Sequence, residues 1–136
     1  MNIKPILIVA GEPNSIFFEI FFKSLKLKKY KSPLILVASY KLLLHQMKIF
    51  NFKKKIRLLN ITNLNKHKLN NKYINLIDVK YNKAQIINKI SKKSIPYIEN
   101  SFQVAFKIIK LGITNKLING PISKKKFFKK KLFRYD

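Results

Sequence analysis

The chain has 136 residues, enough for one domain with a hydrophobic core, and 47% of them are hydrophobic. It contains no cysteine, which excludes disulfides, thiolate catalysis and cysteine-ligated metals. No apolar run approaches the roughly 18 residues of a membrane span, and the amino terminus lacks the parts of a signal peptide, so a cytoplasmic protein with no membrane partner is expected.

The formal net charge of +25 raises the question of a nucleic-acid partner. Only Arg57 and Arg134 of the 30 basic residues are arginines, although nucleic-acid recognition favours the planar guanidinium of arginine. The lysines are spread over the whole length, and Ile and Asn are inflated as well, which is typical of an AT-rich genome. Codon bias therefore explains the charge better than nucleic acid does. A lysine-rich, non-catalytic protein that binds RNA or another polyanion remains the alternative.

The first apolar run, residues 5–10, shows no alternation, which is typical of a parallel strand buried on both faces. It ends at Gly11-Glu12-Pro13, where glycine permits a sharp turn and proline prevents the strand from continuing. Ligands of open α/β sheets bind beyond the carboxyl ends of the strands, so this turn is a candidate site. An ordinary strand-to-helix turn is the alternative.

A helix, a second strand and a second helix are expected next. Asn14 or Ser15 can cap a helix over residues 15–26. Residues 33–38 form a second buried strand, and the helix over residues 40–50 follows it. The expected buried side chains of the first helix are Ile16 and Ile20, with Phe17 and Phe21 as further candidates; those of the second helix are Leu43, Met47 and Phe50.

The middle of the chain has weaker patterns. Residues 55–61 predict a third strand, and residues 63–72 predict a polar loop. Residues 73–79 predict a short strand, for which an edge position in the sheet is considered. Ser39 is placed to cap the helix before them.

The clearest helical periodicity covers residues 97–111, with Gly112 placed to end the helix. Residues 83–95 form a helix candidate before it, interrupted at Ser94-Ile95-Pro96. The expected inward side chains are Ile86, Ile87 and Ile90 in the earlier helix, and Ile98, Phe102, Ala105, Phe106 and Ile109 in the later one.

A second strand-to-turn unit closes the pattern. Residues 114–119 form a strand that ends in Gly120-Pro121, Ser123 would cap the next helix, and Lys124 in its first turn is suited to hold an anionic group. The alternation of strands and helices predicts an α/β fold with a parallel-dominated sheet flanked by helices. The two Gly/Pro loops are then expected to converge, and the candidate site residues are Gly11, Glu12, Pro13, Asn119, Gly120, Pro121 and Lys124.

No catalytic or metal-binding set is visible in the sequence. The chain has five acidic residues without a paired arrangement, and His45 and His67 stand alone without partners at ligand spacing. The residues alone therefore support an α/β domain that binds a phosphate-like anion, and no more.

Three features in order carry a resemblance: Gly11-Glu12-Pro13 with Ile16 and Glu19, then Glu99-Asn100 at the start of a helix, then Gly120-Pro121-Ile122-Ser123-Lys124. Together they resemble the 4-hydroxythreonine-4-phosphate dehydrogenase family of vitamin B6 synthesis. That family opens with Gly-Glu-Pro-x-Gly-Ile-Gly-Pro-Glu and has a later Gly-Pro-x-x-Lys loop. Ser15, Phe17 and Phe18 replace the later glycines and proline of its first motif.

The resemblance implies the amino-terminal portion of a two-lobed, isocitrate-dehydrogenase-like fold, with residues 1–136 as a single, truncated α/β domain lacking the second lobe. It implies an NAD-dependent oxidation of 4-phosphooxy-threonine with loss of CO2, a divalent metal and a homodimer. The family's metal-binding histidines and most substrate-binding residues follow the point where this chain reads Tyr135-Asp136. We therefore expect no catalytic residue and no metal ligand in this chain, and no activity from it alone.

Overall fold

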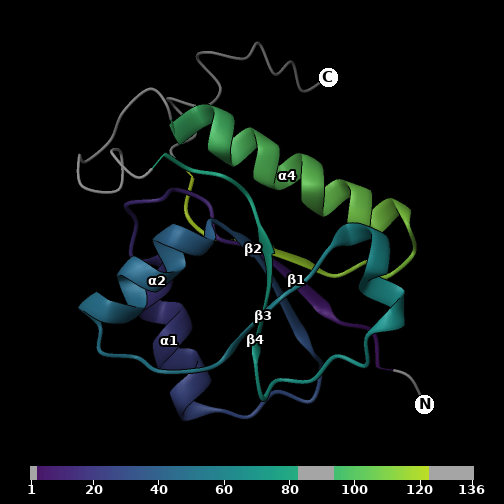
Figure 1. The fold of residues 1–136 in the computed structure, drawn as a ribbon, viewed down its shortest axis with the longest axis horizontal. Helices are drawn as coiled ribbons and strands as arrows, with labels where there is room; N and C mark the ends of the chain where they lie inside the picture. Colours follow the sequence, from purple (N-terminus) through teal and green to yellow (C-terminus); the bar gives the residue numbers. More distant parts are fainter. Residues whose placement is uncertain (1–2, 83–93, 123–136) are drawn as a thin grey trace.

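The computed structural model describes residues 3–82 and 94–122 and shows an open sheet of five parallel strands with helices on both faces (Figure 1). The described elements are β1 (Ile6–Val9), α1 (Phe17–Leu27), β2 (Leu34–Ala38), α2 (Tyr40–Ile49), β3 (Ile56–Leu58), the 3-10 helix η1 (Ile61–Lys66), β4 (Ile74–Asp78), α4 (Ser94–Lys110) and β5 (Leu117–Asn119). The α/β fold with a parallel sheet, and strands within residues 5–10, 33–38 and 114–119, are confirmed.

The strands lie in the order β3-β4-β2-β1-β5, and every neighbouring pair is parallel. β1 and β2 are buried on both faces, which explains their continuous apolar sequences. The edge position considered for residues 73–79 is wrong, because β4 lies between β3 and β2. Its first four residues are buried, as they must be where helices cover both faces of a strand.

The two faces of the sheet have separate cores. α1 and α2 pack on one face, against alternate side chains such as Ile8 and Leu36. α4 and η1 cover the other face, against Leu7 and Val37 (Figure 1). Right-handed crossovers explain the division, because the chain moves from β1 to β2 in one direction and from β4 to β5 in the other. β1 and β5 therefore flank the point where the strand order reverses.

The inward face of α1 differs from the expected one. Ile16 and Ile20 are 61% and 52% exposed, so their placement in the core is wrong. The helix buries four aromatic side chains, of which Phe17 and Phe21 were among the expected candidates: Phe17, Phe18, Phe21 and Phe22. Four phenylalanines in two adjacent pairs offer more apolar area than two isoleucines, so the helix turns that stripe to the sheet.

α2 begins as expected, because the Ser39 hydroxyl accepts a hydrogen bond from the Leu42 N–H at 3.2 Å. Leu43 and Met47 are buried as expected, and Leu42 joins them. Phe50 is 38% exposed, so its assignment to the core is wrong. It follows the last residue of the helix. Among the described aromatic rings, the Phe50 ring contacts only that of Phe22, edge to face, with the centroids 6.1 Å apart.

The third strand is shorter than expected. β3 ends at Leu58, and η1 occupies the end of the predicted strand and the start of the predicted polar loop. The Asn60 side chain accepts the Thr62 N–H at 3.1 Å, and Leu64 of η1 is buried in the core. A local asparagine cap thus stops the extended conformation.

α4 starts earlier than expected, because Ser94-Ile95-Pro96 forms its first turn. Proline is tolerated there, since the first N–H groups of a helix have no partner within it. Gly112 ends the helix with φ +77, as expected. Ile98 and Ala105 are buried, whereas Phe102 and Ile109 are half-buried and Phe106 is exposed, so Phe106 was wrongly assigned to the core. The helix predicted over residues 83–95 lies, apart from its last two residues, outside the described part of the chain.

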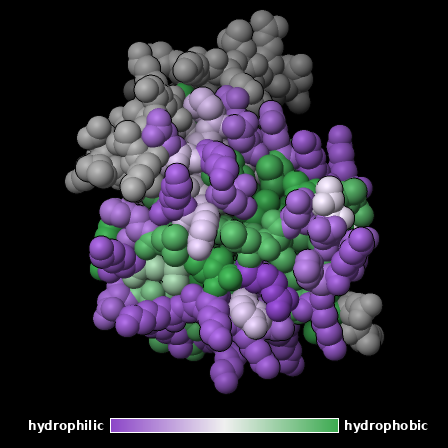
Figure 2. All heavy atoms as spheres, in the orientation of Figure 1, coloured by the Kyte–Doolittle hydropathy of each residue, from purple (hydrophilic) through white to green (hydrophobic). Residues whose placement is uncertain are grey.

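Hydrophilic side chains cover most of the visible surface, around an apolar area in its middle (Figure 2). Within residues 3–82 and 94–122, no helix is both long enough and apolar enough to cross a membrane.

Candidate functional site

The two Gly/Pro loops lie side by side at the carboxyl edge of the sheet. β1 and β5 are paired in register, with Val9 opposite Asn119. The Gly120 N–H donates to the Val9 carbonyl at 2.7 Å, and the Glu12 N–H donates to the Pro121 carbonyl at 2.8 Å. The expected convergence of the loops is confirmed, since backbone hydrogen bonds join them directly.

Glycine is required at both loops by this close approach. Gly11 has φ +80, and a Cβ there would lie 2.6 Å from the Pro121 carbonyl oxygen. A Cβ at Gly120 would overlap the carbonyl oxygen of Ala10 and lie 2.7 Å from the Phe17 ring. The space beside each glycine is thus filled by this chain's own atoms.

The remaining candidate residues line the same edge with different exposure. Pro13 is buried, Glu12 is half-buried, and Asn119 and Pro121 are exposed. The Asn119 amide donates to the Gly120 carbonyl at 2.9 Å, which fixes its orientation over the loop. The structure thus brings six of the seven candidates together, and Lys124, like the predicted cap Ser123, lies outside the described residues.

Ser15 ties the first loop to α1. Its hydroxyl donates to the Glu12 carbonyl at 2.9 Å and accepts the Phe17 N–H at 3.2 Å. The N-cap of α1 is Ile16, which has no side-chain cap, so the assignment of the cap to Asn14 or Ser15 is wrong. Ser15 contacts the helix start from one residue earlier. This double contact sets the direction in which α1 leaves the β1 loop.

A second polar group at this edge was missed by the sequence reasoning. Asp78 ends β4, and its carboxylate accepts the Tyr40 N–H at the start of α2 at 2.8 Å and pairs with Lys80 at 3.1 Å. A carboxylate is favoured at the positive end of a helix. The signal available was an aspartate at the end of the largely apolar strand Ile74–Asp78.

Tyr97 completes this edge from α4. Its buried hydroxyl accepts the Ser39 N–H at 2.9 Å, beside the start of α2. Burial raises the pKa of the Tyr97 hydroxyl far above its usual value, with smaller contributions from Asp78 and Tyr81, although the hydrogen bond from Ser39 opposes the shift. Tyr97 therefore stays protonated and serves to join α4 to the carboxyl end of β2.

The described residues do not fit a divalent metal site. They include no group of three or more His, Asp or Glu side chains that could hold a metal ion. His45 and His67 are both exposed. The N–H groups of Glu12 and Gly120 already donate to carbonyls of the facing loop, so neither is available to a cofactor phosphate. No step through a metal or nucleotide follows from these residues.

Topology and site together define the class of protein: an open, parallel α/β domain whose two glycine loops meet at the point where the strand order reverses. In such sheets this point, at the carboxyl ends of the strands, is where ligands bind.

Comparison with known proteins gives matches among solved structures. A 4-hydroxythreonine-4-phosphate dehydrogenase from Burkholderia phymatum matches 96% of this chain with a TM-score of 0.77 and 15% identity. One from Klebsiella pneumoniae matches 96% with a TM-score of 0.78 and 17% identity. No protein-family model and no curated protein sequence matches the chain. The chain spans 40% and 41% of the two solved chains, so the likeness establishes a shared fold over part of their length.

Proposed function

We propose that this chain forms one lobe of an oxidoreductase of the 4-hydroxythreonine-4-phosphate dehydrogenase type. The observation that carries the proposal is the direct hydrogen bonding of the Gly11 and Gly120 loops at the reversal point of a fold shared with two such enzymes. The loops are the same ones that carry the sequence resemblance. The proposed reaction is NAD-dependent oxidation of 4-phosphooxy-threonine followed by loss of CO2, in the cytoplasm and in a homodimer.

In this proposal the lobe binds and orients and does not carry out the chemistry. The exposed Asn119 amide and the half-buried Glu12 carboxylate are the polar side chains that the two loops bring to the edge. Lys124, which follows the second loop and lies outside the described residues, is proposed to contact the substrate phosphate. The divalent metal of the proposed reaction would have to be held by residues other than the described ones, which include no group of metal ligands.

Binding of 4-phosphooxy-threonine tests the proposal. Calorimetric titration of the whole chain should show saturable binding that Asn119→Ala weakens by about fivefold, the loss of one neutral hydrogen bond. Asn115→Ala is the matched control, because Asn115 is also exposed but precedes β5 at the opposite edge. Equal effects of the two substitutions, or an absence of saturable binding, would contradict the proposed site.

Turnover provides a separate test. We expect the 136-residue chain alone to form no detectable NADH from NAD, a divalent metal and 4-phosphooxy-threonine. Metal activation of an alcohol contributes several kcal/mol to lowering the barrier, and the chain contains only two isolated histidines. Robust metal-dependent turnover would mean that the catalytic residues have been misplaced.

A further inference from the structure

A basic cavity lies at the opposite, amino edge of the sheet. It has a volume of about 440 Å³ and is lined by Leu25, Tyr30, Asn71 and four lysines. The lysines are Lys28, Lys29, Lys54 and Lys72. The lysines come from three separate places, namely the segment after α1, the segment before β3 and the segment before β4. Its size is that of a small-molecule site.

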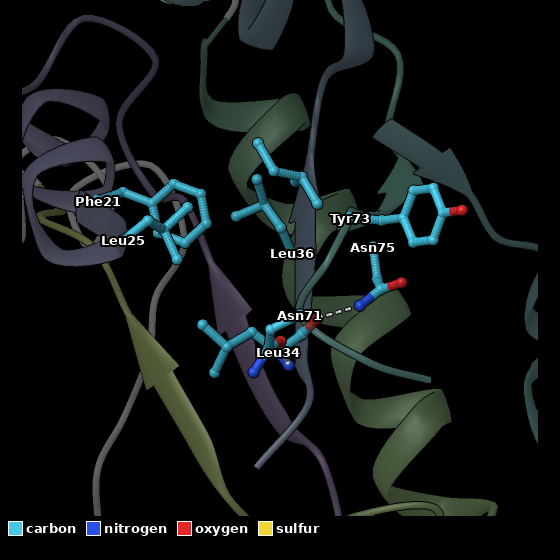
Figure 3. Close-up of a pocket in the computed structure, with 8 residues that line it drawn as sticks. Phe21, Leu25, Leu34, Leu36, Asn71, Tyr73 and Asn75 are labelled. Atoms are coloured by element: carbon cyan, nitrogen blue, oxygen red, sulfur yellow. Dashed lines mark hydrogen bonds between the residues drawn. The ribbon is translucent and has the colours of Figure 1, made fainter. Parts of the chain in front are cut away.

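Asn71 holds the floor of this cavity in place. Its side-chain oxygen accepts the Leu34 N–H at 2.8 Å, and its amide donates to the carbonyls of Tyr30 at 3.0 Å and Ser32 at 2.8 Å. Figure 3 shows Asn71 beside Leu34 at the start of β2, with Leu25 of α1 nearby. These residues also line an adjoining apolar hollow of about 10 Å³, room for one water at most. One asparagine thus fixes the α1–β2 connection against the start of β4.

The charge around the cavity is uncompensated within the described residues. Neither of the two ion pairs found there involves a lysine of the cavity. The described carboxylates lie toward the other end of the sheet, in the β1 loop, the first turn of α1, the end of β4 and the first half of α4: Glu12, Glu19, Asp78 and Glu99. Codon bias explains many lysines but does not explain this separation of charge.

We infer that this cavity binds a small anion that carries several phosphate groups, as a linear polyphosphate or the polyphosphate part of a nucleotide. Four ammonium groups around a concave site offer charge-assisted hydrogen bonds to several phosphate oxygens at once. Single-stranded RNA fits less well, because it requires free aromatic faces for base stacking. Lys28 covers the Tyr30 ring, with its ammonium nitrogen 5.5 Å from the ring centroid.

Calorimetric titration of the whole chain with tripolyphosphate tests the site. We expect one saturable site, weakened by at least about tenfold in the Lys54→Gln/Lys72→Gln double variant. Lys41→Gln/Lys48→Gln is the matched control, since these exposed lysines of α2 carry the same charge but do not line the cavity. Its affinity should fall by less than about twofold, and both variants should keep the parent's unfolding midpoint.

Two further titrations, with adenosine triphosphate and with an RNA oligonucleotide, distinguish which kind of polyphosphate ligand the cavity binds. Adenosine triphosphate binding about tenfold more tightly than tripolyphosphate identifies a nucleotide, and equal affinities identify recognition of the phosphates alone; both support the site. An equal loss of affinity in the two double variants would overturn it, because the attraction would then be diffuse. Binding of an RNA oligonucleotide that tripolyphosphate does not displace would also overturn it.

Discussion

Three glycines show how the same residue type is required for different physical reasons. Gly112 has a left-handed φ, and a Cβ there would meet nothing within 4 Å. Gly120 is not left-handed, but a Cβ there would overlap the carbonyl oxygen of Ala10, directly after β1. Gly11 combines both requirements. Strain and crowding can therefore be separated by one set of substitutions.

Alanine substitutions should follow that division in urea unfolding. Gly112→Ala should cost about 1 kcal/mol, the penalty of a left-handed alanine. Gly120→Ala should cost about 3 kcal/mol or more, because backbone atoms of Ala10, directly after β1, must move. Gly11→Ala should cost at least as much as Gly120→Ala. A Gly120→Ala chain as stable as the Gly112→Ala chain would show that the loops do not approach as described.

Tyr97 gives a prediction about pH. Burial raises the pKa of its hydroxyl in the folded chain above the value of about 10 in the unfolded chain. The folded state then keeps a proton that the unfolded state releases, so the stabilisation is complete below about pH 10. Above that pH it is lost by about 1.4 kcal/mol per pH unit.

Denaturation of the parent chain and Tyr97→Phe at pH 7 to 11, a range set by the ordinary tyrosine pKa of about 10, checks this effect. The variant lacks the hydroxyl that accepts the Ser39 N–H, so at neutral pH it should be less stable by about 1 kcal/mol. The difference should shrink as the pH rises above about 10, since only the parent has this proton to lose. Parallel stability curves would contradict the burial of this hydroxyl.

At the scale of elements, the face of α1 was the clearest error of the sequence interpretation. Isoleucines four residues apart and phenylalanines four residues apart both satisfy helical periodicity. Periodicity gives the width of a stripe but does not say which of two apolar stripes faces the sheet. The stacked pair Phe22 and Phe52, with centroids 4.6 Å apart, shows that contacts from distant segments decide the choice.

A pair of substitutions tests the corrected face. Phe18 is 1% exposed, so Phe18→Ala should lower the free energy of unfolding by about 4 kcal/mol. Ile20 is 52% exposed, so Ile20→Ala should change it by less than about 1 kcal/mol. Chemical denaturation measures both free energies. A larger loss from Ile20→Ala than from Phe18→Ala would show that the Ile16 and Ile20 face packs on the sheet.

Strands and turns were more predictable than faces. The buried strands β1 and β2 and the Gly112 helix end could be read from the chain, because unbroken apolar runs and left-handed glycines leave local signals. The place of β4 could not, since strand order depends on crossovers that span many residues. The convergence of the site loops was predictable from two similar strand-to-turn units. Asp78 was missed because one aspartate at the end of a strand has no distinctive local pattern.

For the whole molecule, the two edges of the sheet have different chemical characters. The carboxyl edge holds the joined glycine loops, the described carboxylates and the starts of the helices. The amino edge holds the lysine-lined cavity. A phosphorylated substrate at the first edge and a polyphosphate anion at the second are independent proposals, since no residue is shared between them.

The most direct test of the proposed function is an NMR titration of the isotope-labelled chain with 4-phosphooxy-threonine, followed through the backbone amide signals. We expect saturable shifts for Glu12, Asn119 and Gly120, which lie at the joined loops. Signals of α2 residues on the outer surface, such as Leu44, should stay unchanged. Shifts confined to Lys28, Lys54 and Lys72 at the amino edge, or no saturable shift at the two loops, would contradict the account.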